Sequence, residues 1–201
     1  MKKGTKGTVF IVDISGYTRF IKATSNDHGT KIIKKLFTSI IEANSLSFQI
    51  SEIEGDAILF YQFGKPVAVK KILNQFKKML DSFNTQVKKL ELIFPEVKDL
   101  SIKVIVHYGI MSIYEIGHFF KLFGKTLVDA HRLLKNSLQL SMYVLITNEY
   151  LQELETFETS PELPGGYRHC ELYDVGNLCY TYFPFFDKLV LNASRLSELQ
   201  I

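Results

Sequence analysis

The sequence predicts an α+β fold in which a mostly antiparallel sheet is layered with helices. Short apolar runs typical of strands alternate with amphipathic helical segments, as in mixed domains. Several strand-like runs also come in pairs around glycine turns, which indicates hairpins and argues against a purely parallel sheet. The 201 residues show no internal repeat, linker or low-complexity segment. We therefore expect a single domain over residues 1–201, with a core over about 8–184 and a tail over 185–201.

The expected elements follow from local patterns. A β-rich run ends at the Ser15-Gly16 turn, and two further runs flank Gly55 like the arms of a hairpin. One helix is marked by an apolar stripe from Val69 to Leu90 at alternating spacings of four and three residues. We expect strands at 8–14, 46–54, 56–63, 101–110 and 143–147, and a final hairpin at Gly176-Asn177. We expect helices over 32–41, from Pro66 through Leu90, over 124–136 and over 149–154, an apolar segment over 111–120 and a loop over 161–166.

Composition narrows the classes of function. Hydrophobic residues make up 46% and charged residues 22%, values ordinary for a soluble globular protein. The net charge of +3 is too small to favour nucleic acid as a partner. No run approaches the roughly 18 apolar residues that span a bilayer, so we expect a cytoplasmic protein without a membrane partner. Cys170 and Cys179 lack a zinc-binding pattern, and we expect free thiols that pack in the fold rather than a redox pair.

Two aspartates lie where an ionised carboxylate is unfavourable without a binding partner. Asp13 ends a strand of the buried type, and Asp56 lies at the tip of the Gly55 hairpin. A carboxylate at the edge of an apolar strand is costly to desolvate unless it is paired, hydrogen-bonded or metal-bound. Two such carboxylates that converge would bind a hard divalent cation. Considered one at a time, each is better explained as a residue that caps a turn.

Four sequence blocks, in order, resemble the motifs of class III adenylyl and guanylyl cyclases. The first is a strand that ends in Asp and is followed by a Gly-aromatic-Thr turn, and the second is a Gly-Asp hairpin tip. The third resembles an Arg-x-Gly-Ile-His-x-Gly strand, and the fourth a Gly-x-x-Val-Asn-x-Ala-x-Arg helix. In this chain the blocks are Phe10–Thr18, Glu52–Ala57, Lys103–Gly109 and Phe123–Leu133. The resemblance implies a ferredoxin-like nucleotide-cyclase fold, similar to a bacterial branch of cyclase-like proteins of unknown function.

The resemblance also implies a site. Asp13 and Asp56, with the backbone carbonyl of Ile14, would hold two divalent ions, Mg²⁺ or Mn²⁺, and backbone N–H groups would face the phosphates of a nucleoside triphosphate. Arg132 would stabilise the transition state. In the family this arginine comes from the other subunit, which implies a head-to-tail homodimer. The residues expected to contribute the backbone N–H groups are Ser15, Gly16, Tyr17 and Thr18.

Base selection would fall to Glu52 and Lys121. Glu52 stands where guanylyl cyclases have glutamate and adenylyl cyclases lysine, and a carboxylate can accept from the N1–H and amino group of guanine. This favours GTP over ATP, although Glu52 could equally be a solvent-facing strand residue. Lys121 replaces the second base-selecting residue of the family.

Other departures weaken the expectation of catalysis. Val128 replaces the asparagine that orients the ribose, and the segment 174–179 lacks the lysine that binds the triphosphate. Loss of one oriented polar contact can lower a rate by about 10²–10³-fold. We therefore expect a metal-nucleotide binding domain with weak or no turnover. The alternatives are an active cyclase that makes cyclic GMP or cyclic AMP and pyrophosphate, and a non-catalytic interaction protein.

Some features resemble functional sites but have a simpler reading. Gly124-Lys125-Thr126 ends like a P-loop but lacks its earlier glycine. His107 and His131 lie in elements of apolar periodicity, and structural roles are expected for both rather than ligand or acid roles. The aromatic residues over 180–186 are expected in the core or at a dimer surface, with a partner-binding patch as the alternative.

Overall fold

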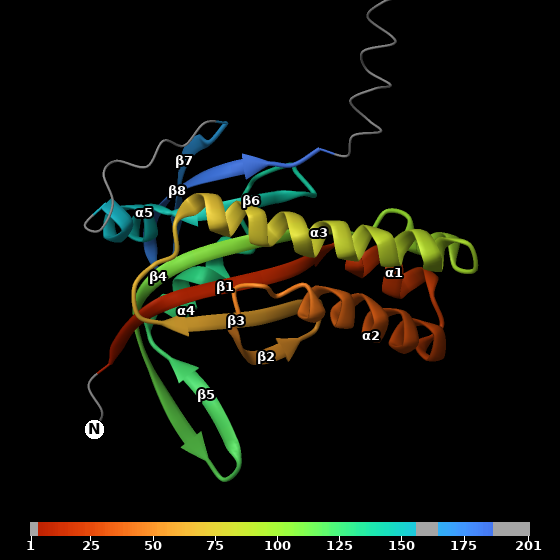
Figure 1. Cartoon of the computed structure of the whole chain (residues 1–201), viewed down its shortest axis with the longest axis horizontal. Helices are drawn as coiled ribbons and strands as arrows, with labels where there is room; N and C mark the ends of the chain where they lie inside the picture. The colour runs from red at the N-terminus through yellow and green to blue at the C-terminus, as the bar shows by residue number, and fades with distance from the viewer. Residues whose placement is uncertain (1–3, 156–164, 187–201) are drawn as a thin grey trace, which may run out of the picture.

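The computed structural model of the chain describes residues 4–155 and 165–186, and Figure 1 shows the arrangement of the elements. Strands and helices alternate along the first half of the chain, and two paired strands end the described part. The strands are β1 Thr5–Ser15, β2 Gln49–Glu54, β3 Ala57–Phe63, β4 Ser101–Ile116, β5 Phe119–Phe123, β6 Tyr143–Thr147, β7 Tyr167–Tyr173 and β8 Gly176–Pro184. The helices are α1 Tyr17–Ala23, α2 Asn26–Glu42, α3 Val69–Glu91, the 3₁₀ helix η1 Pro95–Val97, α4 Lys125–Leu133 and α5 Asn148–Glu155.

The sheet has the order β2-β3-β1-β4-β6-β8-β7, and β5 pairs with the far end of β4. Among the described strands, every pairing is antiparallel except that between β4 and β6. The expected α+β fold with a mostly antiparallel sheet layered with helices is therefore confirmed. β1 lies between β3 and β4, so its carboxyl end meets the turn between β2 and β3.

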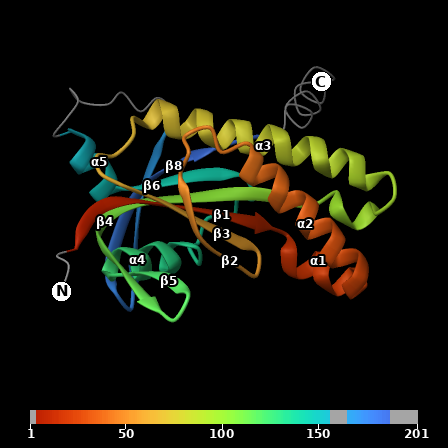
Figure 2. The same ribbon diagram turned by 60° about the horizontal axis from the view of Figure 1, so that its bottom comes forward.

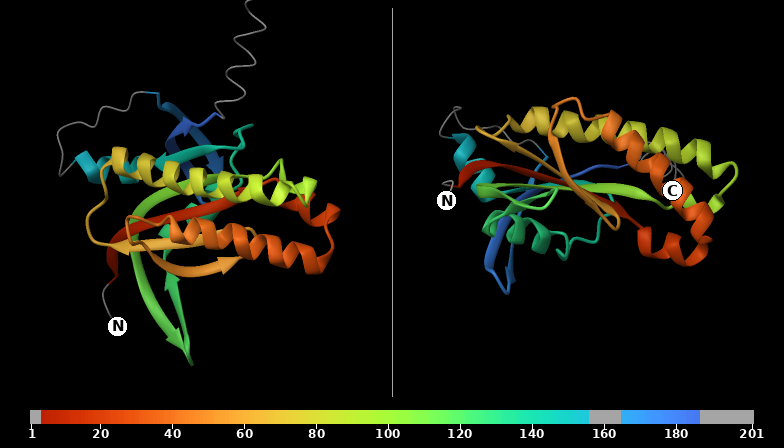
Figure 3. Two further views of the ribbon diagram at one scale, coloured as in Figure 1. Left: turned by 45° about the vertical axis from the view of Figure 1, so that its right-hand side comes forward. Right: turned by 90° about the horizontal axis from the view of Figure 1, so that it is seen from below.

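Helices cover the two faces of the sheet unequally (Figures 2 and 3). α2 and α3 lie along one face, and α4 lies on the opposite face. Side chains on β1 alternate accordingly: Phe10, Val12 and Ile14 join the core under α2 and α3, whereas Val9 and Ile11 join the core under α4. Asp13 lies two residues after Ile11 on the same strand, so its side chain points to the α4 face of the sheet.

Several element boundaries differ from the expectation. The long helix begins at Val69 rather than at Pro66. Ala68 is its N-cap with a non-helical ψ of 138°, and the Val67 carbonyl accepts a hydrogen bond from Tyr150 Oη. The strand expected to end at residue 110 runs to Ile116, and its last residues pair with β5 to form a projecting hairpin. The apolar segment expected over 111–120 is thus part of two strands.

The helix expected through residue 136 ends at Leu133. The Asn136 side chain donates to the Leu133 carbonyl over 2.6 Å and caps the helix there. Most of the expected loop over 161–166 and of the tail over 185–201 lies outside the described residues.

The expectation of free thiols is wrong. Cys170 and Cys179 face each other in register across β7 and β8 and form a disulfide, with a Cα–Cα distance of 4.1 Å. Their separation of nine residues suits directly opposed positions of a tight hairpin. Disulfides are rare in cytosolic proteins, so this disulfide does not favour the expected cytoplasmic location.

Of the aromatic residues near the end of β8, several lie in the core, which was one of the expected locations, whereas Phe186 is exposed. Tyr180 and Phe183 are buried, and Phe185 packs edge-on against Phe76 of α3 at a centroid distance of 4.7 Å.

The core under α3 gives a direct test of the fold. Phe83 is fully buried in this core. Phe83→Ala should lower the free energy of unfolding by about 3–5 kcal/mol, because it removes buried apolar area and leaves a cavity. Thr85→Ala, two residues away on the exposed side of α3, is the matched control. Urea unfolding of both variants checks this, and equal midpoints would contradict the packing described.

Candidate functional site

A cleft of about 490 Å³ opens where β1 ends. Its lining comes from the end of β1, the first turn of α1, the β2–β3 turn and β4. The lining residues are Asp13, Ile14, Ser15, Gly16, Tyr17, Thr18, Arg19, Lys22, Asp56 and Lys103. Every residue expected to bind metal or to face phosphates therefore lies in one cleft.

Backbone pairing brings the two aspartates together. Asp13 is the last β1 residue in register with β3, opposite Ala57, and the Ile14 N–H donates to the Asp56 carbonyl over 2.9 Å. The hairpin tip is thereby fixed against the end of β1. Gly16 then turns the chain into α1 with a φ of 87°, and a Cβ there would lie 2.9 Å from the Asp99 carbonyl oxygen, so glycine is required.

Asp13 is mostly buried, and its charge is balanced by a cation that sequence reasoning missed. Burial raises the pKa of Asp13, the Lys103 ammonium opposes that rise, and the Asp56 carboxylate raises the pKa further. Lys103 lies opposite Asp13 in the β1–β4 register, with Nζ 3.2 Å from the carboxylate. The Lys103 position in the third cyclase-like block was visible in the sequence, but its orientation toward Asp13 depends on strand register.

Arg19 and Lys22 add positive charge to the same cleft, also without having been expected. Arg19 is partly neutralised by Asp99 at 3.5 Å. Three cations beside two carboxylates form a mixed site, which suits a metal ion bound together with phosphates rather than either alone.

The expected base-selecting residues lie outside this cleft. The Lys121 ammonium on β5 donates to the Glu52 carboxylate on β2, and this hydrogen bond raises the pKa of Lys121. The pair joins the projecting hairpin to the sheet edge. Glu52 is thus a paired, half-buried residue rather than a freely solvated one.

Arg132 also lies outside the cleft, on α4. Its Nη2 donates to Asp174 over 2.6 Å, at the turn between β7 and β8. This turn belongs to the segment 174–179, which lacks the lysine that binds the triphosphate in the cyclase family. Asp174 in that segment binds Arg132 instead. Val128, in place of the family's asparagine, is exposed on the same helix.

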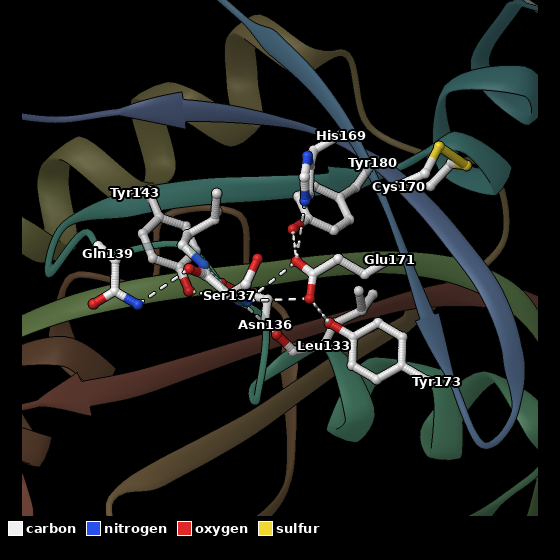
Figure 4. A network of polar contacts seen from close by, with 12 residues as sticks. Leu133, Asn136, Ser137, Gln139, Tyr143, His169, Cys170, Glu171, Tyr173 and Tyr180 are labelled. Atoms are coloured by element: carbon white, nitrogen blue, oxygen red, sulfur yellow. Dashed lines mark hydrogen bonds and ion pairs between the residues drawn. A yellow bond between two sulfur atoms is a disulfide. The ribbon is translucent and has the colours of Figure 1, made fainter.

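A polar network fixes the end of α4 to the β7–β8 hairpin (Figure 4). Glu171 accepts from Tyr180 Oη, from Tyr173 Oη at 3.1 Å and from the backbone N–H of Ser137 at 3.1 Å. Burial opposes ionisation of Glu171, but these donors outweigh it and the pKa of Glu171 is lowered. The network thereby sets the position of the two elements that carry Arg132 and Asp174.

A structural role was expected for both His107 and His131, and the two residues differ in this respect. His107 is buried, with Nδ1 2.8 Å from Thr147 Oγ1, and burial lowers its pKa, so the expected structural role is supported. His131 is exposed, and the expected structural role is not supported for it. Among the described residues, no group of three or more His, Cys, Asp or Glu side chains could hold a metal ion by itself.

The Glu171 network predicts a pH-dependent contribution to stability. Because the folded-state pKa of Glu171 is lowered, its stabilisation is present above the unfolded-state pKa and is lost as pH falls through the folded-state value. Glu171→Gln should cost about 1–2 kcal/mol at neutral pH by losing charge-assisted hydrogen bonds. Urea unfolding from neutral to acidic pH checks this. A stability difference that stays constant, or grows as pH falls, would contradict the assignment.

Comparison with solved structures shows the fold. The guanylyl cyclase Cya2 superposes with a TM-score of 0.70 at 14% identity, covering 92% of this chain and 97% of that one. The guanylate cyclase domain of RhGC from Catenaria anguillulae, solved with GTP, gives a TM-score of 0.59 at 15% identity, covering 90% and 97%. The adenylyl cyclase CyaB from P. aeruginosa gives 0.58 at 15% identity, covering 90% and 95%. The fold is therefore that of class III adenylyl and guanylyl cyclase domains.

Among curated proteins, the chain is 27% identical over 128 residues to the uncharacterized protein Rv2561/Rv2562 of Mycobacterium tuberculosis. That match covers 60% of this chain and 59% of the relative, so the chain spans about six-tenths of the relative's length. Within the described part of the chain, no helix combines the length and apolarity needed to cross a membrane.

A family profile described as "Protein of unknown function (DUF2652)" matches residues 33–143. These residues make up more than half of the chain and run from α2 to the start of β6, which includes Asp56, Lys103 and Arg132. The chain belongs to this family.

Proposed function

We propose that this chain is a cyclase-type domain that binds a purine nucleoside triphosphate together with divalent metal, and that its turnover is weak or absent. The observation that carries the proposal is the cleft at the end of β1, where Asp13 and Asp56 meet Lys103, Arg19 and Lys22. Carboxylates supply the oxygen ligands that Mg²⁺ and Mn²⁺ favour, and the cations suit phosphate oxygens.

The residues present fit a bound divalent ion. Asp13 and Asp56 interact electrostatically, and the rise that Asp56 causes in the pKa of Asp13 is what a shared cation would relieve. Asp13, Asp56 and the Ile14 carbonyl would hold the metal, and the phosphates of the nucleotide would complete its coordination. A bound metal would supply charge neutralisation at the phosphates and activation of the ribose hydroxyl.

Different residues of the chain would then contact different parts of the nucleotide. Lys103 would exchange its contact with Asp13 for a phosphate oxygen once metal occupies the carboxylate, and Lys22 extends the cationic wall. The turn at Ser15, Gly16, Tyr17 and Thr18 would pack against the phosphates, since it lines the same cleft.

The Glu52–Lys121 pair favours guanine as the base. The Glu52 carboxylate can accept from N1–H and the amino group of guanine, and the Lys121 ammonium can donate to O6. Adenine presents an amino donor where guanine presents O6, and it would oppose the Lys121 ammonium. GTP is therefore the preferred substrate class.

One copy of the chain does not unite the two halves of this site. Glu52, Lys121 and Arg132 are all absent from the lining of the metal cleft. A head-to-tail homodimer would bring the base-selecting half of one copy to the metal half of the other. The projecting β4–β5 hairpin offers a surface for that contact, because its large apolar side chains are exposed: Ile113, Tyr114, Ile116, Phe119, Phe120 and Phe123.

The proposal of weak turnover rests on the part of the site that lies on α4 and the β7–β8 turn. Arg132 is bound to Asp174 in its own chain, and Val128 can form no hydrogen bond to a ribose hydroxyl. Stabilisation of the transition state would require Arg132 to leave a carboxylate 2.6 Å away. The retained Arg132 favours the alternative of an active cyclase, in which the ribose 3′-hydroxyl attacks the α-phosphate and pyrophosphate leaves.

Titration calorimetry with Mn²⁺ and a non-hydrolysable GTP analogue tests the binding proposal. Asp56→Asn should weaken binding at least about tenfold, because it removes a charged metal ligand. Glu54→Gln removes a neighbouring exposed carboxylate outside the cleft and should leave binding unchanged. An absence of binding by the unmodified protein would favour the non-catalytic interaction protein, and equal losses in both variants would contradict the assigned site.

A gain-of-function experiment tests why turnover is weak. Val128→Asn combined with Asp174→Lys restores an amide at the ribose position and a cation in place of the acid that binds Arg132. Formation of cyclic GMP with Mn²⁺ should rise by about 10²-fold or more over the unmodified chain, since each oriented contact is worth about that factor.

Adding Asp56→Asn to that double variant should abolish the gain. Turnover by the unmodified protein equal to that of the double variant would support the active-cyclase alternative and contradict the degenerate site.

A further inference from the structure

The helical layer opposite α4 carries a net positive charge that the rest of the chain lacks. α2 and α3 together hold nine lysines against four carboxylates, whereas the whole chain has a net charge of only +3. The remainder of the chain is therefore net negative. The positive charge is concentrated on one face of the molecule, the face on which α2 and α3 lie in Figures 2 and 3.

The lysines of α3 form an ordered array. They occur as the pairs Lys70-Lys71, Lys77-Lys78 and Lys88-Lys89, separated by seven and eleven residues. Those spacings are close to whole numbers of helical turns, so the pairs stack on the same side of the helix. All six are exposed, and the opposite side of α3 is buried in the core. The array extends over most of a helix about 34 Å long.

α2 extends this surface. Lys31, Lys34 and Lys35 are exposed and line a groove shared with Gln86 of α3, so they adjoin the α3 array. Within the described residues, only Lys77 among the nine lysines forms an ion pair, with Asp81. Lys78 donates a hydrogen bond to Ser45 Oγ over 3.1 Å, a neutral partner that leaves its charge uncompensated. The remaining ammonium groups are available to an anionic partner.

Two apolar side chains lie at one end of the basic face. Leu92 and Ile93 follow the last turn of α3, which contains Lys88, Lys89 and one exposed carboxylate, Glu91, and their exposed fractions are 87% and 73%. Aliphatic side chains so fully exposed beside a basic helix suit the boundary between lipid headgroups and acyl chains.

We propose that the α2–α3 face docks on an anionic lipid surface, with Leu92 and Ile93 entering the headgroup region. The chemistry of the face favours lipid over other polyanions. Neither helix contains arginine, the side chain suited to bidentate recognition of phosphate, and neither exposes a phenylalanine, tyrosine or tryptophan ring on which a base could stack. Lysine clusters next to aliphatic anchors are suited to the diffuse charge of anionic headgroups.

The surface is independent of the proposed nucleotide site. The projecting β4–β5 hairpin and α4 lie away from the α2–α3 layer, so a dimer formed through them would leave the basic face open (Figure 3). The expectation of no membrane partner rested on the lack of a spanning segment, and surface docking does not require one.

Vesicle co-sedimentation tests the proposal. The unmodified chain should bind phosphatidylcholine vesicles that contain phosphatidylglycerol, bind pure phosphatidylcholine weakly, and be released by high salt. Lys88→Gln combined with Lys89→Gln should weaken binding roughly tenfold or more, because each lysine near an anionic surface contributes about a fivefold factor. Leu92→Ser combined with Ile93→Ser should also weaken it.

The matched control is Lys135→Gln combined with Arg168→Gln, which removes the same charge from exposed residues outside both helices. This control should bind vesicles like the unmodified chain. Equal losses in the Lys88/Lys89 and control variants, equal binding to neutral vesicles, or tighter binding to duplex DNA than to anionic vesicles in parallel titrations would each overturn the proposal.

Discussion

The antiparallel pairing of β1 with both β3 and β4 determines where the charged groups of the cleft lie. Through β3 it fixes the hairpin tip, and with it Asp56, against the end of β1. Through β4 it sets Lys103 opposite Asp13. A shift of one residue in either register would turn these side chains to the other face of the sheet. The cleft is therefore a property of strand register in the middle of the sheet, where apolar packing on both faces holds that register.

The two halves of the proposed site differ in their electrostatics. At the end of β1, carboxylates and cations alternate in one cleft, and both can find partners in a metal–phosphate complex. On α4 and the β7–β8 turn, Arg132 is already paired with Asp174. The Glu171 network and the disulfide lie in the same hairpin, so the acid that binds Arg132 is held on a well-connected element. This arrangement supports the proposal of a domain that binds its ligand but turns it over weakly, because Arg132 is present but paired with an acid of its own chain.

Sequence patterns predicted the fold class and most of the elements, because these depend on local periodicity. The co-location of Asp13 with Asp56 followed from the resemblance of four sequence blocks to cyclase motifs. Local patterns could not predict contacts between elements that lie far apart in the sequence. The Lys103–Asp13 pair depends on register, and the Arg132–Asp174 pair joins a helix to a turn 42 residues away. The disulfide was missed although both cysteines flank the expected hairpin. The turn lies at Asp174-Val175 rather than at Gly176-Asn177, and only this register sets Cys170 opposite Cys179. Helix boundaries were misplaced where tertiary hydrogen bonds limit a helix that local sequence would extend. The bond from Tyr150 Oη to the Val67 carbonyl, just before the first residue of α3, is an example.

The most direct measurement is crystallographic. Crystals grown with Mn²⁺ and a non-hydrolysable GTP analogue, recorded at a wavelength where manganese scatters anomalously, would locate the metal. Our account predicts anomalous density within about 2.2 Å of carboxylate oxygens of both Asp13 and Asp56, since hard divalent ions bind oxygen ligands at about that distance. Bound nucleotide with no manganese between these two carboxylates would contradict it.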